Sequence, residues 1–300
     1  MTRRWISAAR RLKWAAIEAL LKLAFLSANV SASFGPYRRR SHQAYGSDRR
    51  QQLDVYIPNV TPASPAPLVV FWHGGRWSSG DKTDYRFVGS ALAELGVATV
   101  IPNYRHYPQV KLAGFMEDAA RAACWAAAHA ADFGADPGRL YLMGHSAGAH
   151  MAALLSLDPR YFAALGADPP RIAGVIGLSG PYDFLPLREA DVQDMFGPPE
   201  LYELSQPIYF AHRGAPPMLL IHGSKDTLVS PWNSRNLAAA LELLGVRVTL
   251  RLYAGRGHVG TVAALSVPGR RRGTTLADIA EFIAAGGRQA ACDAATEGIA

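Results

Sequence analysis

The sequence is poor in cysteine, which occurs only as Cys124 and Cys292 among 300 residues. The two lie far apart and have neither the spacing of a disulfide framework nor that of paired zinc ligands. A disulfide-stapled scaffold and a zinc-finger protein are therefore excluded, and the redox compartment stays open. The chain also lacks internal repeats, and its composition is neither collagen-like nor that of a disordered chain.

A membrane-spanning run is also missing from the first thirty residues, because their uncharged stretch is too short to cross a bilayer. The hydrophobic content of 49% is enough to build a sizeable core, and 300 residues is an ordinary length for one α/β domain. The sequence therefore predicts one domain over residues 37–287, with a separate N-terminal segment at 1–36 and a flexible tail at 288–300.

The net charge of +7 is concentrated in a few clusters. Clusters of this kind bind either nucleic acid or anionic membranes. No nucleic-acid-binding motif accompanies them and aromatic neighbours are sparse, so we expect no nucleic-acid partner. The clusters are Arg3, Arg4, Arg10, Arg11 and Lys13; Arg38, Arg39, Arg40, Arg49 and Arg50; and Arg270, Arg271 and Arg272.

The N-terminal segment 1–36 has the pattern of a basic amphipathic helix, with charged residues on one side and apolar residues mainly on the other. Such a helix suits a membrane surface or a groove on its own domain. The rival interpretation is a secretory signal ending at "VSA" before Ser33, but Glu18 and Lys22 interrupt the apolar core that a signal needs. We expect a cytoplasmic protein with peripheral membrane contact through this helix, and secretion is less favoured.

Strand-like and helix-like segments alternate along most of the chain after an arginine-rich linker at 37–50. This alternation predicts an α/β fold, a doubly wound and mostly parallel sheet with helices on both faces. Residues 181–216 are irregular and rich in proline and aromatics, which favours a lid-like insertion above the sheet. The predicted strands are 53–58, 67–75, 97–105, 139–144, 172–180, 217–223 and 246–253, and the predicted helices are 87–96, 116–134, 147–157, 234–245 and 276–287.

The pentapeptide Gly144-His145-Ser146-Ala147-Gly148 follows a predicted strand and begins a predicted helix. In this context G-x-S-x-G is typical of a nucleophile elbow, in which a strained serine projects its hydroxyl at the edge of the sheet. Its neighbours must be tiny because strand and helix approach closely there, and the N–H of Ala147 can face a developing oxyanion. By itself the pentapeptide is also compatible with a glycine-rich turn that carries an incidental serine.

A serine hydroxyl needs a base to take its proton, and that base needs an acid to hold its tautomer. His258 lies in a glycine-flanked loop after the last predicted strand, and Asp226 lies in the loop after the preceding strand. Both loops follow the carboxyl ends of strands, where open α/β sheets build their sites. Asp183 is the rival acid, whereas His145 and His222 are expected to support loops.

The segment "FWHGGRW" continues the second buried strand into a loop. Gly74 and Gly75 let the backbone approach the serine, and their N–H groups are predicted to form an oxyanion hole with that of Ala147. Arg76 and Trp77 are predicted to bind substrate, with the Arg76 side chain entering or charging the pocket rim.

Together, the motifs "HGGRW", "PNYRHYP", "GHSAGAH", "GSKDTLV" and "GHVG" resemble those of the α/β-hydrolase superfamily over roughly residues 50–286. The chain looks closest to the carboxylesterase branch that includes hormone-sensitive-lipase-like and feruloyl-esterase-like enzymes. It is also similar to kynurenine formamidase. Many lipase-like members have a third glycine where Arg76 stands here.

The resemblance implies a serine hydrolase that cleaves short-chain or aryl carboxylic esters through an acyl-enzyme, with Ser146 as nucleophile, His258 as base and Asp226 as acid. The partner is then a small-molecule ester or amide, and neither a metal nor an organic cofactor is implied. One alternative is an arylformamidase acting on N-formylkynurenine, with Arg76 or the arginines at 270–272 receiving a substrate carboxylate. Another is a catalytically silent, membrane-associated binding protein. The oligomeric state is left open.

Overall fold

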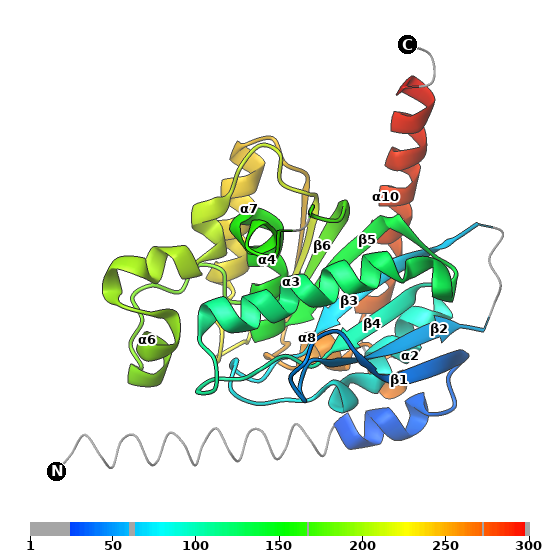
Figure 1. Ribbon diagram of the computed structural model, residues 1–300, viewed down its shortest axis with the longest axis horizontal. Helices are drawn as coiled ribbons and strands as arrows, with labels where there is room; N and C mark the ends of the chain where they lie inside the picture. The colour runs from blue at the N-terminus through cyan, green and yellow to red at the C-terminus, as the bar shows by residue number, and fades with distance from the viewer. Residues whose placement is uncertain (1–24, 60–63, 167, 272, 298–300) are drawn as a thin grey trace.

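The computed structural model describes residues 25–59, 64–166, 168–271 and 273–297, with side chains up to residue 286. Most of the predicted N-terminal helix lies outside the described residues, but 25–32 are helical. Eight strands form one sheet in the order β1-β2-β4-β3-β5-β6-β7-β8, and helices cover both of its faces (Figure 1). The strands are β1 (Tyr37–Ala44), β2 (Gln52–Pro58), β3 (Ala66–Trp72), β4 (Ala98–Pro102), β5 (Ala135–His145), β6 (Ile172–Leu178), β7 (Met218–Gly223) and β8 (Val248–Tyr253).

Strands β1 and β2 are the antiparallel part of the sheet, since β1 pairs with β2 and β2 with β4 in opposite directions. From β4 to β8 all neighbouring strands are parallel, which confirms the predicted α/β fold. The α-helices are α2 (Arg86–Glu94), α3 (Leu112–Ala128), α4 (Ala147–Leu157), α5 (Arg160–Ala163), α6 (Ala190–Phe196), α7 (Trp232–Leu243), α8 (Gly260–Ala263), α9 (Val267–Arg270) and α10 (Thr275–Glu297). The 3-10 helices are η1 (Lys82–Tyr85), η2 (Ala130–Phe133), η3 (Pro199–Ser205) and η4 (Pro207–Phe210).

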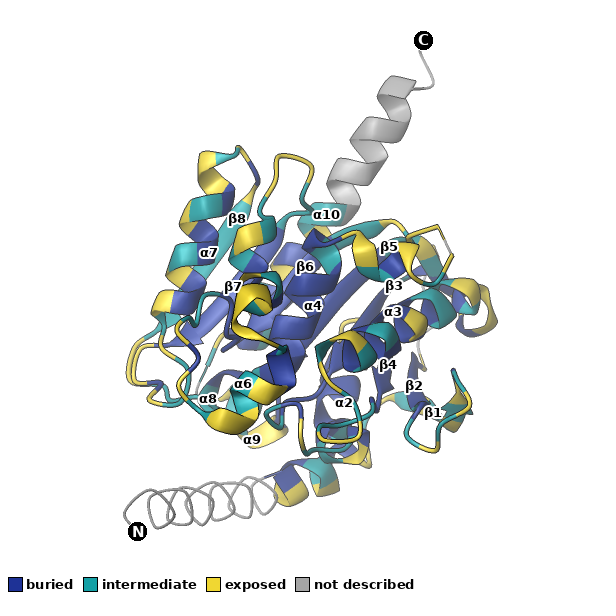
Figure 2. Cartoon of the chain, turned by 60° about the vertical axis from the view of Figure 1, so that its left-hand side comes forward, coloured by how far each residue is buried: buried dark blue, intermediate teal, exposed yellow. Residues whose placement is uncertain are grey.

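The apolar side chains of the central strands pack into two hydrophobic cores, one on each face of the sheet. In β3, Leu68 and Val70 belong to the core under α3, α4 and α7, whereas Val69 and Phe71 belong to the core under α2, α10 and the helix at 25–32. This follows from the two-residue period of a strand, which sends successive side chains to opposite faces. Figure 2 shows these strands as the buried centre of the molecule.

The linker predicted at 37–50 is wrong in its first half, because 37–44 form the edge strand β1. The sequence of β1 is YRRRSHQA, and its residues alternate between half-buried and exposed. An edge strand can pair through its backbone alone and often carries charged side chains, so apolar alternation does not reveal it.

At the other end of the chain, α10 is helical to Glu297, past residue 287 where the sequence predicted the helix to end and a flexible tail to begin. Adjacent glycines weaken a helix without necessarily ending it.

The predicted insertion at 181–216 leaves the sheet after β6 and returns to it at β7. It is more regular than expected, since it contains α6, η3 and η4. Figure 1 shows α6 at one side of the molecule, away from the strands. No helix in the described part of the chain is long and apolar enough to cross a membrane.

Candidate active site

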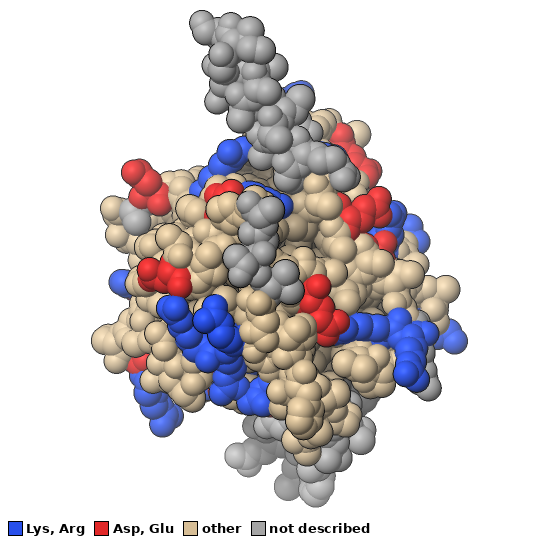
Figure 3. Space-filling model, turned by 90° about the vertical axis from the view of Figure 1, so that its right-hand side faces the viewer, with Lys and Arg blue, Asp and Glu red and all other residues tan. Residues whose placement is uncertain are grey.

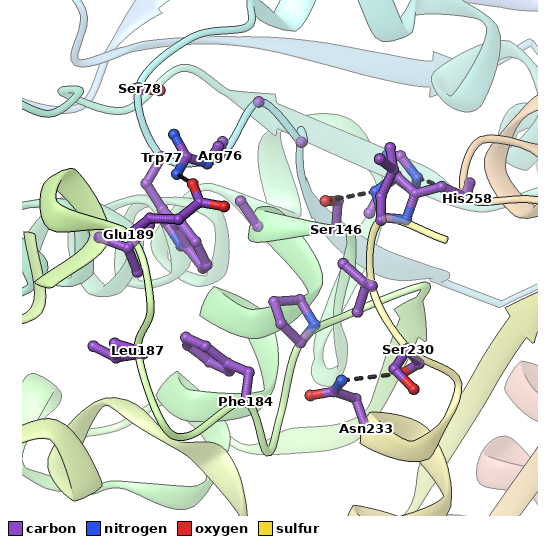
Figure 4. A pocket seen from close by; sticks show the side chains of 18 of the residues that line it. Arg76, Trp77, Ser78, Ser146, Phe184, Leu187, Glu189, Ser230, Asn233 and His258 are labelled. Atoms are coloured by element: carbon purple, nitrogen blue, oxygen red, sulfur yellow. Dashed lines mark hydrogen bonds and ion pairs between the residues drawn. The ribbon is translucent and has the colours of Figure 1, made fainter. Parts of the chain in front are cut away.

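The structure brings together Ser146, Asp226 and His258, which follow the carboxyl ends of β5, β7 and β8. The Nε2 atom of His258 lies 2.8 Å from the Oγ atom of Ser146 (Figure 4). The Nδ1 atom of His258 lies 2.7 Å from Oδ2 of Asp226. The imidazole therefore links the hydroxyl and the carboxylate in one hydrogen-bonded line, although 112 residues separate Ser146 from His258.

The backbone of Ser146 is strained, with φ 55° and ψ −121° at the junction of β5 and α4. Its N–H donates to the carbonyl of Leu178 at 2.8 Å. A Cβ atom at Gly148 would lie 2.0 Å from the carbonyl oxygen of Trp72, and one at Gly144 would lie 2.2 Å from the carbonyl carbon of Gly148. Both glycines of the pentapeptide are therefore required by close backbone contacts, as expected for a nucleophile elbow.

The carboxylate of Asp226 accepts hydrogen bonds at both of its oxygens. Oδ1 accepts from the backbone N–H groups of Leu228 and Val229 at 2.9 Å each. Oδ2 accepts from His258 and also from Nε2 of His222 at 3.1 Å. Burial alone would raise the pKa of Asp226, but the hydrogen bonds from His222 and His258 outweigh it and hold that pKa well below its usual range.

His222 is a functional residue that the sequence assigned only to loop support. Its Nε2 lies 3.1 Å from Asp226 and 3.0 Å from the carbonyl oxygen of Val229, and both of these groups can only accept. Nε2 therefore carries a proton, and Nδ1 lies 2.8 Å from the hydroxyl of Ser234. His222 is thus held as a donor to the carboxylate of Asp226 and helps to orient it.

Asp183, the rival acid, does not contact His258. The Oδ2 atom of Asp183 accepts from Nδ2 of Asn236 at 2.6 Å, and Asp183 lines the cavity beside Ser146. The carboxylate that pairs with His258 is that of Asp226, as the sequence predicted.

The prediction that the N–H of Gly74 faces the oxyanion is wrong, because that N–H donates to the hydroxyl of Tyr85 at 3.3 Å. A glycine at position 74 instead lets the backbone lie close to Ser146, since a Cβ atom there would be 3.2 Å from Cβ of Ser146. Gly75 adopts φ 129°, a conformation that favours glycine. The backbone N–H groups of Gly75 and Ala147 have no acceptor among the described residues, which leaves both available to a ligand.

A buried hydrogen-bonded chain connects the loops that carry Gly74, Ser146 and His258. Nε2 of His145 lies 3.2 Å from the carbonyl oxygen of His258, which can only accept, so Nε2 carries the proton. Burial lowers the pKa of His145 to about 3, so the ring is neutral and Nδ1 accepts from the Tyr85 hydroxyl at 3.4 Å. The Tyr85 oxygen in turn accepts from Gly74. All three bonds therefore have one consistent direction.

A cavity of about 650 Å³ opens above Ser146. Its wall is mainly apolar, and much of it comes from the insertion between β6 and β7 and from the loop after β7 (Figure 4). Cavities of this size and character suit small organic ligands. The apolar wall residues include Trp77, Phe184, Leu187, Val192, Leu228 and Val229.

The side chain of Arg76 closes one rim of the cavity by pairing with the insertion. It forms an ion pair with Glu189 (Figure 4) and a second one with Asp191 at 2.6 Å. Asp194 is held nearby by Lys111, at 2.7 Å, and by the hydroxyl of Tyr107, at 3.0 Å. The predicted capture of a substrate carboxylate by Arg76 is not supported, since two carboxylates of the chain already neutralise its guanidinium.

The arginine cluster at 270–272 does not reach this cavity in the part that the structure describes. Arg270 lies on α9, where it pairs with Glu94 and donates to the carbonyl of Leu265. Among the described residues, no group of three or more His, Cys, Asp or Glu side chains could hold a metal ion.

Comparison with known proteins agrees with this geometry. A profile of the BD-FAE family matches residues 53–241. The chain belongs to the BD-FAE family. This places it among the α/β-hydrolase carboxylesterases, and the matched residues include Ser146 and Asp226 but stop before His258.

Two curated relatives carry esterase names. The chain is 31% identical to a probable isoprenylcysteine alpha-carbonyl methylesterase of Arabidopsis thaliana, over 80% of this chain and 54% of that protein. It is 32% identical to esterase LipC of Mycobacterium tuberculosis, over 82% of this chain and 65% of that protein. The chain thus spans between about half and two thirds of the length of these relatives. No formamidase is among these named relatives.

Solved structures share the fold. Esterase B from Lactobacillus rhamnosis, solved with an inhibitor, aligns with a TM-score of 0.80 at 22% identity and covers 97% of this chain and 98% of that one. At this level of identity the likeness supports the α/β-hydrolase fold of the BD-FAE chain and not its substrate.

The first prediction concerns the Tyr85 hydroxyl. Tyr85→Phe leaves the N–H of Gly74 and Nδ1 of His145 buried without partners. The hydrogen-bonded chain between the loops that carry Gly74 and His258 is then broken. We expect kcat for ester hydrolysis to fall about tenfold with little change in KM, as for about 1–2 kcal/mol of lost hydrogen bonding. Tyr141→Phe is the matched control, because it removes another buried phenol, whose hydroxyl donates to the carbonyl of Ile283 at 3.1 Å. Equal kcat values for the two variants would contradict the connection.

The second prediction concerns the acid stability that Asp226 supplies. Its folded pKa is depressed, so its contribution to stability is complete above its unfolded pKa of about 4 and is lost as pH falls toward the folded value. Asp226→Asn should therefore be less stable than the wild type at neutral pH, and the difference should shrink below about pH 4. Urea unfolding midpoints measured from neutral to acidic pH test this. A difference that is constant with pH would show that the carboxylate's charge is not the cause.

Proposed function

We propose that this chain is a serine carboxylesterase that cleaves short-chain or aryl carboxylic esters through Ser146, His258 and Asp226. The observation that supports it is the hydrogen-bonded line from carboxylate to hydroxyl, which ends at the floor of an apolar cavity. Membership of the BD-FAE family supports the same chemistry.

In this mechanism Nε2 of His258 takes the proton of Ser146 as Oγ forms a bond to the ester carbonyl carbon. The tetrahedral intermediate collapses, the bond to the leaving oxygen breaks, and His258 gives its proton to the departing alcohol. Water then repeats the sequence on the acyl-enzyme, releasing the acid and free Ser146. Asp226 stays ionised throughout and stabilises the imidazolium that forms in each step.

The N–H groups of Gly75 and Ala147 stabilise the oxyanion. Gly75 belongs to the loop after β3, and Ala147 directly follows Ser146 in the chain. Ala147 is the first residue of α4, so the positive end of the helix dipole adds to its N–H. Each such donor contributes about 3 kcal/mol to catalysis in serine hydrolases.

The substrate preference follows from the cavity wall. Apolar side chains such as Phe184 and Leu187 favour an uncharged acyl or aryl group. The pairing of Arg76 with Glu189 and Asp191 disfavours a substrate that carries its own carboxylate, such as N-formylkynurenine. The Arabidopsis relative is named for a methyl ester of an isoprenylcysteine, which is also an apolar ester.

The third prediction is a substrate panel of nitrophenyl acetate, butyrate and octanoate beside N-formylkynurenine. We expect turnover of the nitrophenyl esters, with N-formylkynurenine cleaved at least a hundredfold more slowly. Ser146→Ala should lose activity toward every substrate by about a thousandfold or more and should lose labelling by a fluorophosphonate probe.

Each outcome bears on one part of the proposal. Fast formamide cleavage by an ester-blind enzyme would replace the esterase with the arylformamidase. Failure of the wild type to react with the fluorophosphonate would favour the silent binding protein instead. Full activity in Ser146→Ala would remove Ser146 from the mechanism.

A further inference from the structure

Two neighbouring residues in the loop after β3, Arg76 and Trp77, adopt the left-handed backbone conformation. Their φ angles are 56° and 57°, and no other consecutive pair of non-glycine residues in the described part of the chain has positive φ. This conformation is unfavourable for residues with a Cβ atom, because Cβ comes too close to the following carbonyl oxygen. The N–H of Ser78 donates to the carbonyl of Gly75 at 3.0 Å, so residues 75–78 form a turn of type I′. Such turns favour asparagine, aspartate or glycine at their two central positions, which here hold an arginine and a tryptophan.

This turn fixes Gly75, whose N–H is one of the two proposed oxyanion donors. The carbonyl of Gly75 accepts from the N–H groups of Ser78 and Ser79, at 3.0 and 2.9 Å, and from the Ser79 hydroxyl at 3.1 Å. If Arg76 or Trp77 relaxed to negative φ, the turn would open and this carbonyl would lose the donors that hold it. The direction of the Gly75 N–H therefore depends on a strained turn.

Helix α6 of the insertion contacts both side chains of the turn. At the start of α6, the guanidinium of Arg76 donates to both carboxylate oxygens of Asp191, at 2.6 and 3.1 Å, and it also pairs with Glu189. At the end of α6, the ring of Phe196 lies edge-on to the ring of Trp77, with 4.9 Å between the ring centroids. Figure 4 shows the side chains of Arg76 and Glu189 directed toward each other. One helix of seven residues thus holds two successive strained residues that lie more than a hundred positions away in the chain.

The ring of Trp77 also contacts the helix that follows the nucleophile. It is 5% exposed, and it lies edge-on to the ring of His150 on α4 with 5.0 Å between the centroids. Because α4 begins at Ala147, directly after Ser146, the same ring places the turn relative to the second oxyanion donor. Both donors are therefore positioned through the side chain of Trp77.

We propose that α6 keeps Arg76 and Trp77 in the strained turn and thereby keeps the N–H of Gly75 directed at the oxyanion. The α6 residues that contact the turn are then positioning residues, which act through the turn and do not touch the reacting atoms. A strained turn keeps its shape only while the surrounding contacts hold it, so the insertion has a role in catalysis besides forming a wall of the cavity. This role of α6 rests on the proposed esterase function.

Two simpler roles for the ion pairs of Arg76 fit the structure less well. One is ordinary surface charge, of the kind that Figure 3 shows in scattered groups on the side of the molecule away from α6. Exposed ion pairs contribute little to stability, whereas the Arg76 side chain is only 23% exposed and bonds both oxygens of one carboxylate. The other is a direct electrostatic effect of the guanidinium on the oxyanion, which the two neighbouring carboxylates oppose because they neutralise its charge.

The fourth prediction compares Arg76→Ala with Arg76→Asn in the hydrolysis of nitrophenyl butyrate. Both variants lose the ion pairs with α6, but asparagine tolerates the left-handed conformation far better than alanine does. We expect kcat of Arg76→Ala to fall about tenfold with little change in KM, because an oxyanion donor acts in the transition state and not on the bound ester. Arg76→Asn should have a kcat about fivefold above that of the alanine variant. Arg121→Ala is the control and should keep the wild-type kcat, since Arg121 pairs with Glu117 at 2.8 Å within α3, where alanine causes no strain.

Glu189→Gln/Asp191→Asn tests the same contacts from the side of α6. This double variant keeps Arg76 and the apolar wall of the cavity, and its kcat should also fall about tenfold. Adding Arg76→Asn to the double variant should raise kcat by about fivefold, because the turn then depends less on the ion pairs. Such a rescue by a third substitution is not expected if the carboxylates serve only to hold the insertion in place.

Equal kcat values for Arg76→Ala and Arg76→Asn would overturn the role of α6, because the loss would then come from the guanidinium itself. A higher KM at unchanged kcat would also overturn it and would assign the ion pairs to the cavity wall. Should thermal unfolding show that Arg76→Ala does not fold, the presence or absence of the rescue decides between the two outcomes. A wild type that hydrolyses no ester would overturn the proposed function itself, whereas an active wild type without these differences would overturn only the role of α6.

Discussion

The close approach of α4 to the ends of β3 and β5 is the constraint on which the candidate site depends. Gly148 packs against the carbonyl of Trp72 with no space for a side chain, and Gly144 packs against Gly148. The chain can then turn from strand to helix only through a strained residue, and Ser146 takes that conformation at φ 55°. The strain is retained because the surrounding contacts leave no alternative, and it directs the hydroxyl toward His258.

Backbone carbonyls, which can only accept hydrogen bonds, determine which ring nitrogens of His145 and His222 carry a proton. The carbonyl of His258 requires a proton on Nε2 of His145, and the carbonyl of Val229 requires one on Nε2 of His222. These two imidazoles flank His258, one through the backbone of its loop and one through Asp226. His222 also contacts a hydroxyl and a carboxylate, but its hydroxyl partner Ser234 is fully buried. The hydroxyl partner of His258 is Ser146, which lines the cavity and can meet a ligand there. The assignment of base among the histidines thus follows from the geometry of their neighbours.

The sequence predicted the fold and the three central residues because each signal is local. Ser146, Asp226 and His258 follow predicted strands, and parallel strands bring their carboxyl ends to one edge. The contacts it missed join residues far apart in the chain whose types have many other uses. Tyr85 is an ordinary tyrosine until its hydroxyl is placed between Gly74 and His145, and Arg76 pairs with Glu189 across 113 residues. Strand β1 was missed for a different reason, since an edge strand of arginines has no apolar period.

The charges at the rim of the cavity bear on which ligands the cavity can hold. At the rim, Arg76 is neutralised by Glu189 and Asp191, and Lys111 by Asp194, so the charges cancel within the fold. The cavity therefore offers little net attraction to a charged ligand and selects by shape and apolar contact. Under the proposed esterase function, the apolar wall of the cavity therefore determines which ester enters.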